Sequence, residues 1–441
     1  MEKPKLPINR LVSFDEFTGF FIMIEIAGFH AKTDSGPDGL TGFFCPCNIL
    51  IFLFLVLAGP VQVCLADSHE DETEDVKTVL DDSPFLSARA AGMGGALSTL
   101  ADGIHAPFYN PAGIGGLHWG RTRPPVIRQL HFPYVGVGAN EATAKLKKEF
   151  SELGGGDDKG VGAAIVDAHA GQRQYGRGTA LVSMVVSRLM FVQSFDTQFA
   201  AFRKENETDP AKAISASYRS QSGTGAGMSV TDSKETLYLG AFASFNQRSQ
   251  LKGDFAYNDL VRSEDRKANL SPNMKRYSGV AGNLGMIWKL GNYGRPALAL
   301  VNKNVGGARY NLSGDKSQTD PEEHRIVDPE NLTIGFSLSP EVGKNGAFNF
   351  IIEGQNLTQK EVALNKKFRT AVELNLGGFG SEAVFGVRAG YNLAGASFGL
   401  NLNLGLVQFE AASHAEDIGT GNLHVAERRN VAVFSVNVLY E

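Results

Sequence analysis

The chain has 441 residues, and 42 Lys and Arg against 47 Asp and Glu give it a formal net charge of −5. This mildly acidic balance argues against nucleic-acid binding through a basic surface. The content of 29 Phe and 11 Tyr argues against global disorder. Glycine is in excess, with 51 residues against a usual share of about 7%. A mean hydropathy near zero argues against a bundle of lipid-exposed helices, but it fits a membrane β-barrel, whose strands alternate apolar and polar residues.

Residues 1–66 are predicted to be a leader that contains a signal peptide. The sustained apolar run ILIFLFLVLA at 49–58 is typical of a signal-peptide core, and small residues near Ala66 fit a cleavage site. A basic segment does not directly precede this run, so we expect translation to start later than Met1, with residues 1–40 outside the true product. A signal anchor and a lipoprotein are the alternatives, although the run is short for a membrane span.

The cysteines support the same division of the chain. Cys45, Cys47 and Cys64 all lie within the predicted leader. A mature protein that begins at Asp67 would therefore contain neither a disulfide nor a thiolate metal site.

Two segments of unusual composition follow the leader. Residues 67–83 are rich in Asp and Glu and predict a solvated, disordered tail. Residues 84–120 are rich in glycine and contain SARAAGMGGALSTLADGIHAPFYNPAGIGGL from Ser87 to Leu117. Within this segment Asn110-Pro111 is a turn signal, because Pro fixes φ and Asn bonds nearby backbone.

Residues 121–441 show a recurrent alternation of side chains that predicts β-strands. Phe398, Leu400 and Leu402 alternate with small or polar residues, of which Asn401 is one. We expect about fifteen strands of this kind, at 129–138, 179–190, 192–202, 213–220, 225–231, 236–247, 277–290, 296–302, 332–339, 347–355, 368–376, 383–392, 396–403, 406–413 and 430–440.

The arrangement of these strands predicts an all-β fold, a transmembrane antiparallel up-and-down β-barrel. Short turns would lie on one side, and long polar loops at 254–275 and 309–330 on the other. A soluble β-sandwich also alternates and is the alternative. Small or polar residues on one strand face, with large apolar residues on the other, favour the barrel.

A helical insert is predicted after the first strand, within 139–170. Ala142, Leu146 and Phe150 recur near helical spacing, and Asn140 is a candidate N-cap. A second short helix is expected at 161–170.

The glycine-rich segment resembles the N-terminal segment of the bacterial long-chain fatty-acid transporter superfamily. The resemblance lies in the SARAxGMGGA phrase at Ser87–Ala96 and the NPAG phrase at Asn110–Gly113. Related branches include the barrel proteins of type IX secretion and the TraF-like conjugation barrels, and the helical insert looks most like the latter. The resemblance implies a bacterial outer-membrane barrel of about fourteen strands, with residues 84–120 inside as a hatch.

The resemblance carries over the motif Asn110–Ala112 and its glycine-rich run, and the candidate hatch and ligand-binding residues lie in and beside these. Glycine permits tight turns and close backbone approach, and a polar lumen can satisfy the backbone of a plug. Whether the hatch is a movable gate or a static plug is left open by the sequence. The candidate residues are Gly92, Gly94, Gly95, Phe108, Tyr109, Asn110, Pro111 and Ala112.

The sequence predicts no catalytic site, no metal site and no cofactor. Gly395–Gly399 matches G-x-S-x-G, but it opens an alternating strand, whereas the hydrolase elbow needs a turn from strand to helix. Gly92–Gly95 is not preceded by a strand, as a dinucleotide loop would require. The nine His are scattered without metal-ligand spacing.

Two functional hypotheses follow, neither enzymatic. The first is a passive channel or carrier for small hydrophobic molecules, gated by the hatch and embedded in outer-membrane lipid. The alternative is a non-transporting barrel that binds a periplasmic or surface protein of a secretion or conjugation assembly through residues 139–170. An apolar pocket beside Asn110 would favour transport, and a lumen that is polar throughout would count against it. Nucleic acid is not expected as a partner of either.

Overall fold

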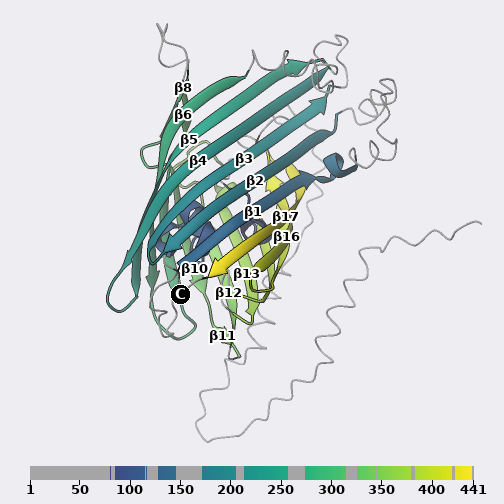
Figure 1. Ribbon diagram of the computed structural model, residues 1–441. Helices are drawn as coiled ribbons and strands as arrows, with labels where there is room; N and C mark the ends of the chain where they lie inside the picture. Colours follow the sequence, from purple (N-terminus) through teal and green to yellow (C-terminus); the bar gives the residue numbers. More distant parts are fainter. Residues whose placement is uncertain are drawn as a thin grey trace, which may run out of the picture. The chain divides into compact units, whose positions relative to one another are not determined.

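The computed structural model describes residues 80, 85–114, 116, 128–145, 171–204, 213–256, 274–313, 325–343, 345–378, 383–419 and 423–439 (Figure 1). The described residues all belong to one compact unit, residues 71–441. The predicted leader lies outside the described residues, as does the acidic tail apart from Leu80. No helix among the described residues is long and apolar enough to cross a membrane.

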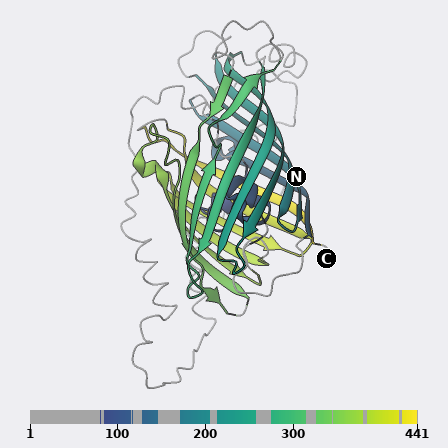
Figure 2. The same ribbon diagram turned by 90° about the vertical axis from the view of Figure 1, so that its left-hand side faces the viewer.

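The strands form one antiparallel sheet that closes on itself (Figures 1 and 2). β1 pairs with β2 on one side and with β17 on the other, which completes the ring. The strands are β1 (Arg128–Asn140), β2 (Arg173–Val186), β3 (Leu189–Arg203), β4 (Ile214–Thr231), β5 (Leu237–Phe255), β6 (Lys275–Lys289), β7 (Ala297–Lys303), β8 (Ala308–Leu312), β9 (Arg325–Asp328), β10 (Asn331–Leu338), β11 (Glu341–Val342), β12 (Gly346–Gly354), β13 (Phe368–Leu376), β14 (Phe385–Asn392), β15 (Gly395–Asn403), β16 (Val407–Asp417) and β17 (Ala426–Leu439).

The ring has fourteen strand positions within the described part of the chain. β6 pairs with both β7 and β8, so β7 and β8 together form one strand of the ring. β9 pairs with β8, and β10 pairs with β7, so β9 and β10 together form the next strand, which β11 extends along β12. The prediction of an all-β, up-and-down barrel of about fourteen strands is confirmed.

Side chains divide between an apolar outer face and a polar lumen. Phe398 and Leu400 are 56% and 49% exposed, whereas Asn401 between Leu400 and Leu402 is 0% exposed. The expected alternation of this strand is therefore confirmed, with the large apolar residues outside. Other strand residues that are apolar and exposed are Val137, Phe191, Phe195, Phe199, Val230, Leu239, Phe245, Val280, Leu284, Ile334, Ile352, Phe409 and Phe434. An apolar outer band around a polar interior is the pattern of a transmembrane barrel.

Sequence predictions of strand boundaries were wrong at several places. The strand expected at 179–190 runs past the end of β2 at Val186 into β3, which begins at Leu189. The strands expected at 213–220 and 225–231 are one strand, β4. Gly223, in the gap between the two expected strands, lies within β4 opposite Asn246 of β5, where an added Cβ would come within 2.4 Å of Asn246 Oδ1. The loop expected at 309–330 contains β8 and β9, which pair with each other and lengthen the barrel wall.

The predicted helical insert is described only at its start. Residues 141–145 are helical, and Thr143 N donates a hydrogen bond of 3.0 Å to Asn140 Oδ1, as expected of an N-cap. Residues 146–170 lie outside the described residues. The hypothesis that 139–170 binds a protein partner therefore stays a prediction.

The glycine-rich segment forms short helical turns inside the ring (Figure 2). These are α3 (Ala88–Gly92), η3 (Gly103–His105), α4 (Ala106–Tyr109) and η4 (Pro111–Gly113). α3 packs on β14, β15, β16 and β17, whereas η4 packs on β4, β5 and β6. Their apolar side chains form the largest buried cluster of the described residues together with inward residues of the wall. We refer to residues 85–114 as the hatch.

Candidate functional site

The first part of the hatch touches the barrel wall backbone to backbone. A Cβ added to Gly92 would lie 2.8 Å from Gly399 Cα of β15, and one added to Gly390 of β14 would lie 2.2 Å from the carbonyl carbon of Met93. Gly94 has a φ of +59°, a left-handed conformation that favours glycine. The GMGG phrase therefore lets the chain turn while it lies directly on two wall strands.

The Asn-Pro-Ala turn contacts the opposite wall in the same way. Asn110 Oδ1 accepts a hydrogen bond of 3.1 Å from Ala112 N, which starts η4 with Pro111 at its first position. Asn110 Nδ2 donates to the carbonyl oxygens of Ser98, at 2.9 Å, and of Met286, at 3.2 Å. Asn110 thus joins two parts of the hatch and binds β6.

Wall glycines make room for this turn. A Cβ added to Gly240 of β5 would lie 2.2 Å from the carbonyl carbon of Pro111, and one added to Gly285 of β6 would lie 2.0 Å from Asn110 Oδ1. The two close approaches fix the position of the turn against β5 and β6.

A buried ionic cluster also fastens the hatch to the wall. Arg89 of α3 forms two parallel hydrogen bonds of 2.9 Å to Glu373 of β13, and a third of 2.6 Å to Asp102. Arg388 of β14 donates to the same Glu373 carboxylate at 2.8 Å. Arg89, Glu373 and Arg388 are fully or almost fully buried. Removal of one member of such a cluster strongly destabilises the folded protein, because a buried charge is left without its partner.

The ionic cluster around Arg89 was not predicted from the sequence. Arg89 is the one charged residue between Ser87 and Ala101, and a charge within a run of small, apolar residues is a signal of a buried ion pair. Its partner, however, lies 284 positions away.

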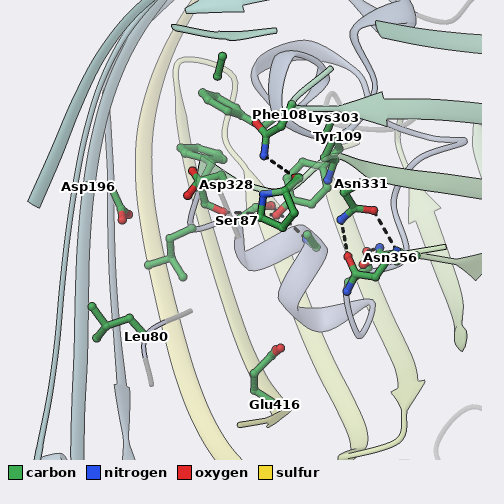
Figure 3. Close-up of a pocket in the computed structure, with 18 of the residues that line it drawn as sticks. Leu80, Ser87, Phe108, Tyr109, Asp196, Lys303, Asp328, Asn331, Asn356 and Glu416 are labelled. Carbon is green, nitrogen blue, oxygen red and sulfur yellow. Dashed lines mark hydrogen bonds between the residues drawn. The ribbon is translucent and has the colours of Figure 1, made fainter. Parts of the chain in front are cut away.

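A cavity of about 750 Å³ lies between the hatch and the wall (Figure 3). Its aromatic lining consists of Phe85, Phe108, Tyr109, Phe242 and Tyr310. Phe85 and Phe108 stack with ring centroids 4.7 Å apart, and Phe242 meets Phe108 edge to face at 5.9 Å. Much of the remaining lining is polar and includes Asp196, Arg219, Gln221, Asn246, Arg248, Lys303, Asp328, Asn331, Asn356, Arg369 and Arg429.

The predicted hatch residues divide into two sets. Gly94, Gly95, Phe108 and Tyr109 line the cavity. Gly92, Asn110, Pro111 and Ala112 do not; they are occupied by the contacts between hatch and wall. The cavity is thus mixed in character, with its apolar part at Phe108 and not at Asn110.

The residues that resemble catalytic motifs are engaged in structural contacts. Ser397 lies within β15, where its Oγ accepts a hydrogen bond of 3.4 Å from Ala415 N. His105 Nδ1 lies 3.2 Å from Ser87 Oγ. Burial, followed by the nearby charge of Arg89, lowers the pKa of His105 well below its usual value, so the ring is neutral at pH 7. The described residues include no group of His, Cys, Asp or Glu arranged for a metal ion.

The closed ring, its apolar outer band and the segment inside its lumen define a transmembrane β-barrel of the kind found in bacterial outer membranes, with a plugged interior.

The chain is similar in structure to several solved proteins. No family model matches the chain, and no curated protein matches it. The chain is similar to the toluene transporter TbuX of Ralstonia pickettii, at 11% identity and a TM-score of 0.45, over 82% of this chain and 100% of that one. It is similar to a mutant of the monoaromatic hydrocarbon channel TodX, at 12% identity and a TM-score of 0.46, over 82% and 100%. A FadL homologue from Pseudomonas aeruginosa has 13% identity and a TM-score of 0.41, over 81% and 98%.

Proposed function

We propose that the protein is a passive channel or carrier that brings small hydrophobic molecules across the outer membrane, with the hatch as its gate. The observation that carries this proposal is the aromatic surface formed by Phe85, Phe108, Tyr109 and Phe242 at the base of the lumenal cavity. Ligand pockets combine such apolar and aromatic surface with a few polar groups that fix orientation.

The position of the cavity suggests the direction of entry. Its lining includes residues of the links 355–367 and 418–425, which join strands at the barrel end that also carries the insert at 141–172. In outer-membrane barrels the longer links face outward and the short turns face the periplasm. A molecule arriving from outside would therefore meet the hatch at its aromatic surface, to which Phe85, Phe108 and Tyr109 belong.

Movement beyond this surface requires a change in the hatch or a path beside it. Described contacts hold the hatch on both sides of the ring, through Arg89 on β13 and through Asn110 on β6. A gate must release one of these attachments, whereas a static plug keeps both. The chain carries no nucleotide motif that would supply energy, so we expect the flux to follow the concentration gradient.

An engineered disulfide tests both transport and gating. A Cβ added to Gly335 of β10 would lie 2.4 Å from Ser98 Oγ of the hatch, so the pair Ser98→Cys and Gly335→Cys is placed to form a cross-link. The three natural cysteines all precede Asp67 and leave the barrel free of competing thiols. Uptake of labelled toluene is measured in vesicles whose outer leaflet is lipopolysaccharide, before and after reduction with dithiothreitol.

A mobile gate predicts uptake by wild type, little uptake by the oxidised double variant, and recovery after reduction. Each single cysteine variant serves as a control for the substitutions alone. Equal uptake by the oxidised and reduced forms would show that the hatch is a static plug. Uptake by wild type no faster than by vesicles without protein would refute transport.

A further inference from the structure

At least half of the six described Lys and Arg side chains that line the lumenal cavity form ion pairs with carboxylates. Three of them have ion pairs of 2.6 to 3.0 Å, which are Arg248 with Asp328, Arg429 with Glu427 and Lys366 with Asp417. These cations are neutralised where they stand, as is usual for charges withdrawn from water.

Two cavity-lining cations differ from this pattern. Lys303, the last residue of β7, makes no ion pair with a described carboxylate; its ammonium lies 5.0 Å from the centre of the Tyr109 ring. Arg369 of β13 donates through Nη1 to the carbonyl oxygen of Gly94 at 2.9 Å, and its Nε is buried without a hydrogen-bond partner. Both side chains line the cavity.

The two cations belong to one side of the cavity. Lys303 pairs in the sheet with Asn331 of β10, whose side chain is hydrogen-bonded to Asn356. Figure 3 shows Lys303, Tyr109, Asn331 and Asn356 grouped together at this side. Arg369 of β13 lies opposite Glu353 of β12, and β12 pairs with β10, whose Asn331 lies opposite Lys303. An anion placed beside both cations would remove their mutual repulsion.

The carboxylate that lies opposite Arg369 in the sheet is already engaged. Glu353 of β12 accepts a hydrogen bond of 2.8 Å from Ser98 N through one oxygen and a second bond from Gln355 Nε2 through the other. Two cations against this one carboxylate leave a local excess of one positive charge.

We propose that this side of the cavity binds an organic anion, an aromatic monocarboxylate, with its carboxylate at Lys303 and Arg369 and its ring against Tyr109 and Phe108. The inference rests on the proposed function for the location of the site and names its substrate class. A charge-assisted hydrogen bond suits both cations, and no described carboxylate forms an ion pair with Arg369, which lines the cavity.

The shape of the apolar lining favours a ring over a long alkyl chain. Apolar contact is concentrated at the hatch and its neighbours, where Phe85, Phe108 and Phe242 form adjoining ring faces. Beyond them the wall presents Gln221, Asn246 and other polar groups. A long alkyl chain would have to lie against these groups and strip them of water, whereas a compact ring would not.

The experiment is calorimetric titration of the full chain in detergent micelles. The probes are benzoate, toluene as the neutral ring, octanoate as the alkyl acid, and inorganic phosphate as the plain anion. The variants are Lys303→Gln and Arg369→Gln. Lys366→Gln is the matched control, because it removes a lining cation that is already paired with Asp417.

We expect benzoate to bind wild type more tightly than toluene, octanoate or phosphate. Loss of a hydrogen bond to a charged group should weaken benzoate binding about tenfold or more in each variant, leave toluene binding unchanged, and have no effect in Lys366→Gln. Lys303→Arg should restore most of the affinity. In wild type alone, added salt should weaken benzoate but not toluene, a result that does not depend on the folding of any variant.

Three results would overturn the inference. Benzoate affinity unchanged in Lys303→Gln would remove the cationic site, tighter binding of octanoate would replace the aromatic class with an alkyl one, and equal binding of phosphate would reduce the site to a plain anion site. If toluene binds and benzoate binds no better, this inference alone fails. If neither ring compound binds, the proposed function fails with it.

Discussion

The contact between the hatch and β6 makes a sharp prediction for a pair of glycines on one strand. Gly285 and Gly282 both lie in β6. A Cβ added to Gly285 would lie 2.0 Å from Asn110 Oδ1 and 2.9 Å from Pro111 Cδ, whereas one added to Gly282 meets nothing within 4 Å. Gly285→Ala should therefore displace the Asn110 turn, and Gly282→Ala should not.

The expected cost follows from what the displacement breaks. Asn110 cannot rotate away freely, because it accepts a bond from Ala112 N and donates to Ser98 and Met286. Forcing an extra methyl group into a packed site costs about 1–3 kcal/mol, and each hydrogen bond lost adds about 1 kcal/mol. With one or two of these bonds lost, Gly285→Ala should lower the free energy of unfolding by about 2–5 kcal/mol.

The assay is urea unfolding of the folded barrel in detergent, followed by tryptophan fluorescence and by limited proteolysis of the hatch. Gly285→Ala should unfold at a lower urea concentration and expose residues 85–114 to protease. The free energy of unfolding of Gly282→Ala should match that of wild type within about 1 kcal/mol, the range of intrinsic β-strand propensities. Equal effects of the two substitutions would refute the reasoning that Asn110 is held against β6 at Gly285.

Two further predictions concern charged groups. Arg89→Gln should destabilise the protein by about 3–5 kcal/mol in the same urea assay, because Glu373 loses its bidentate partner; a change below about 1 kcal/mol would contradict the anchoring role. In the β4–β5 turn, the backbone N–H of Leu237 and the hydroxyl of Thr236 lower the pKa of Asp232 to about 2. Its stabilisation should be present above about pH 4 and lost as the pH falls toward 2, so the Tm of Asp232→Ala should approach that of wild type there; a Tm gap independent of pH would exclude this.

The barrel could be predicted because its signal is local. A strand that faces lipid on one side and the lumen on the other must alternate with a period of two, and β15 with Phe398, Leu400 and Asn401 carries that period in its own residues. β4 was divided in error at residues 221–224, because the contact that requires a glycine at position 223 comes from Asn246 on another strand and leaves no signal in the local sequence.

The candidate site was predictable only in part, because only some of its residues are neighbours in the sequence. The hatch phrases are contiguous, so their glycines and the Asn110 turn stand out in the sequence. The interaction of Arg89 with Glu373 and the proximity of Lys303 to Tyr109 depend on the register of strands far along the chain. The extension of the wall by β8 and β9 was missed because residues such as Arg309, Asn311 and Arg325 are exposed and polar, which in sequence resembles a loop.

The order of the elements along the chain means that the hatch can complete its contacts only late in assembly. The hatch directly precedes β1, yet β1 obtains its second neighbour only when β17, the final strand, is in place. The ionic anchor of Arg89 lies on β13 and β14, 284 positions and more downstream. Contacts so distant in sequence form late, since the intervening chain must first be ordered. Docking of the hatch is therefore complete only when the wall is complete, and a chain truncated before β13 would hold the hatch at β6 through Asn110 but lack the Arg89 anchor.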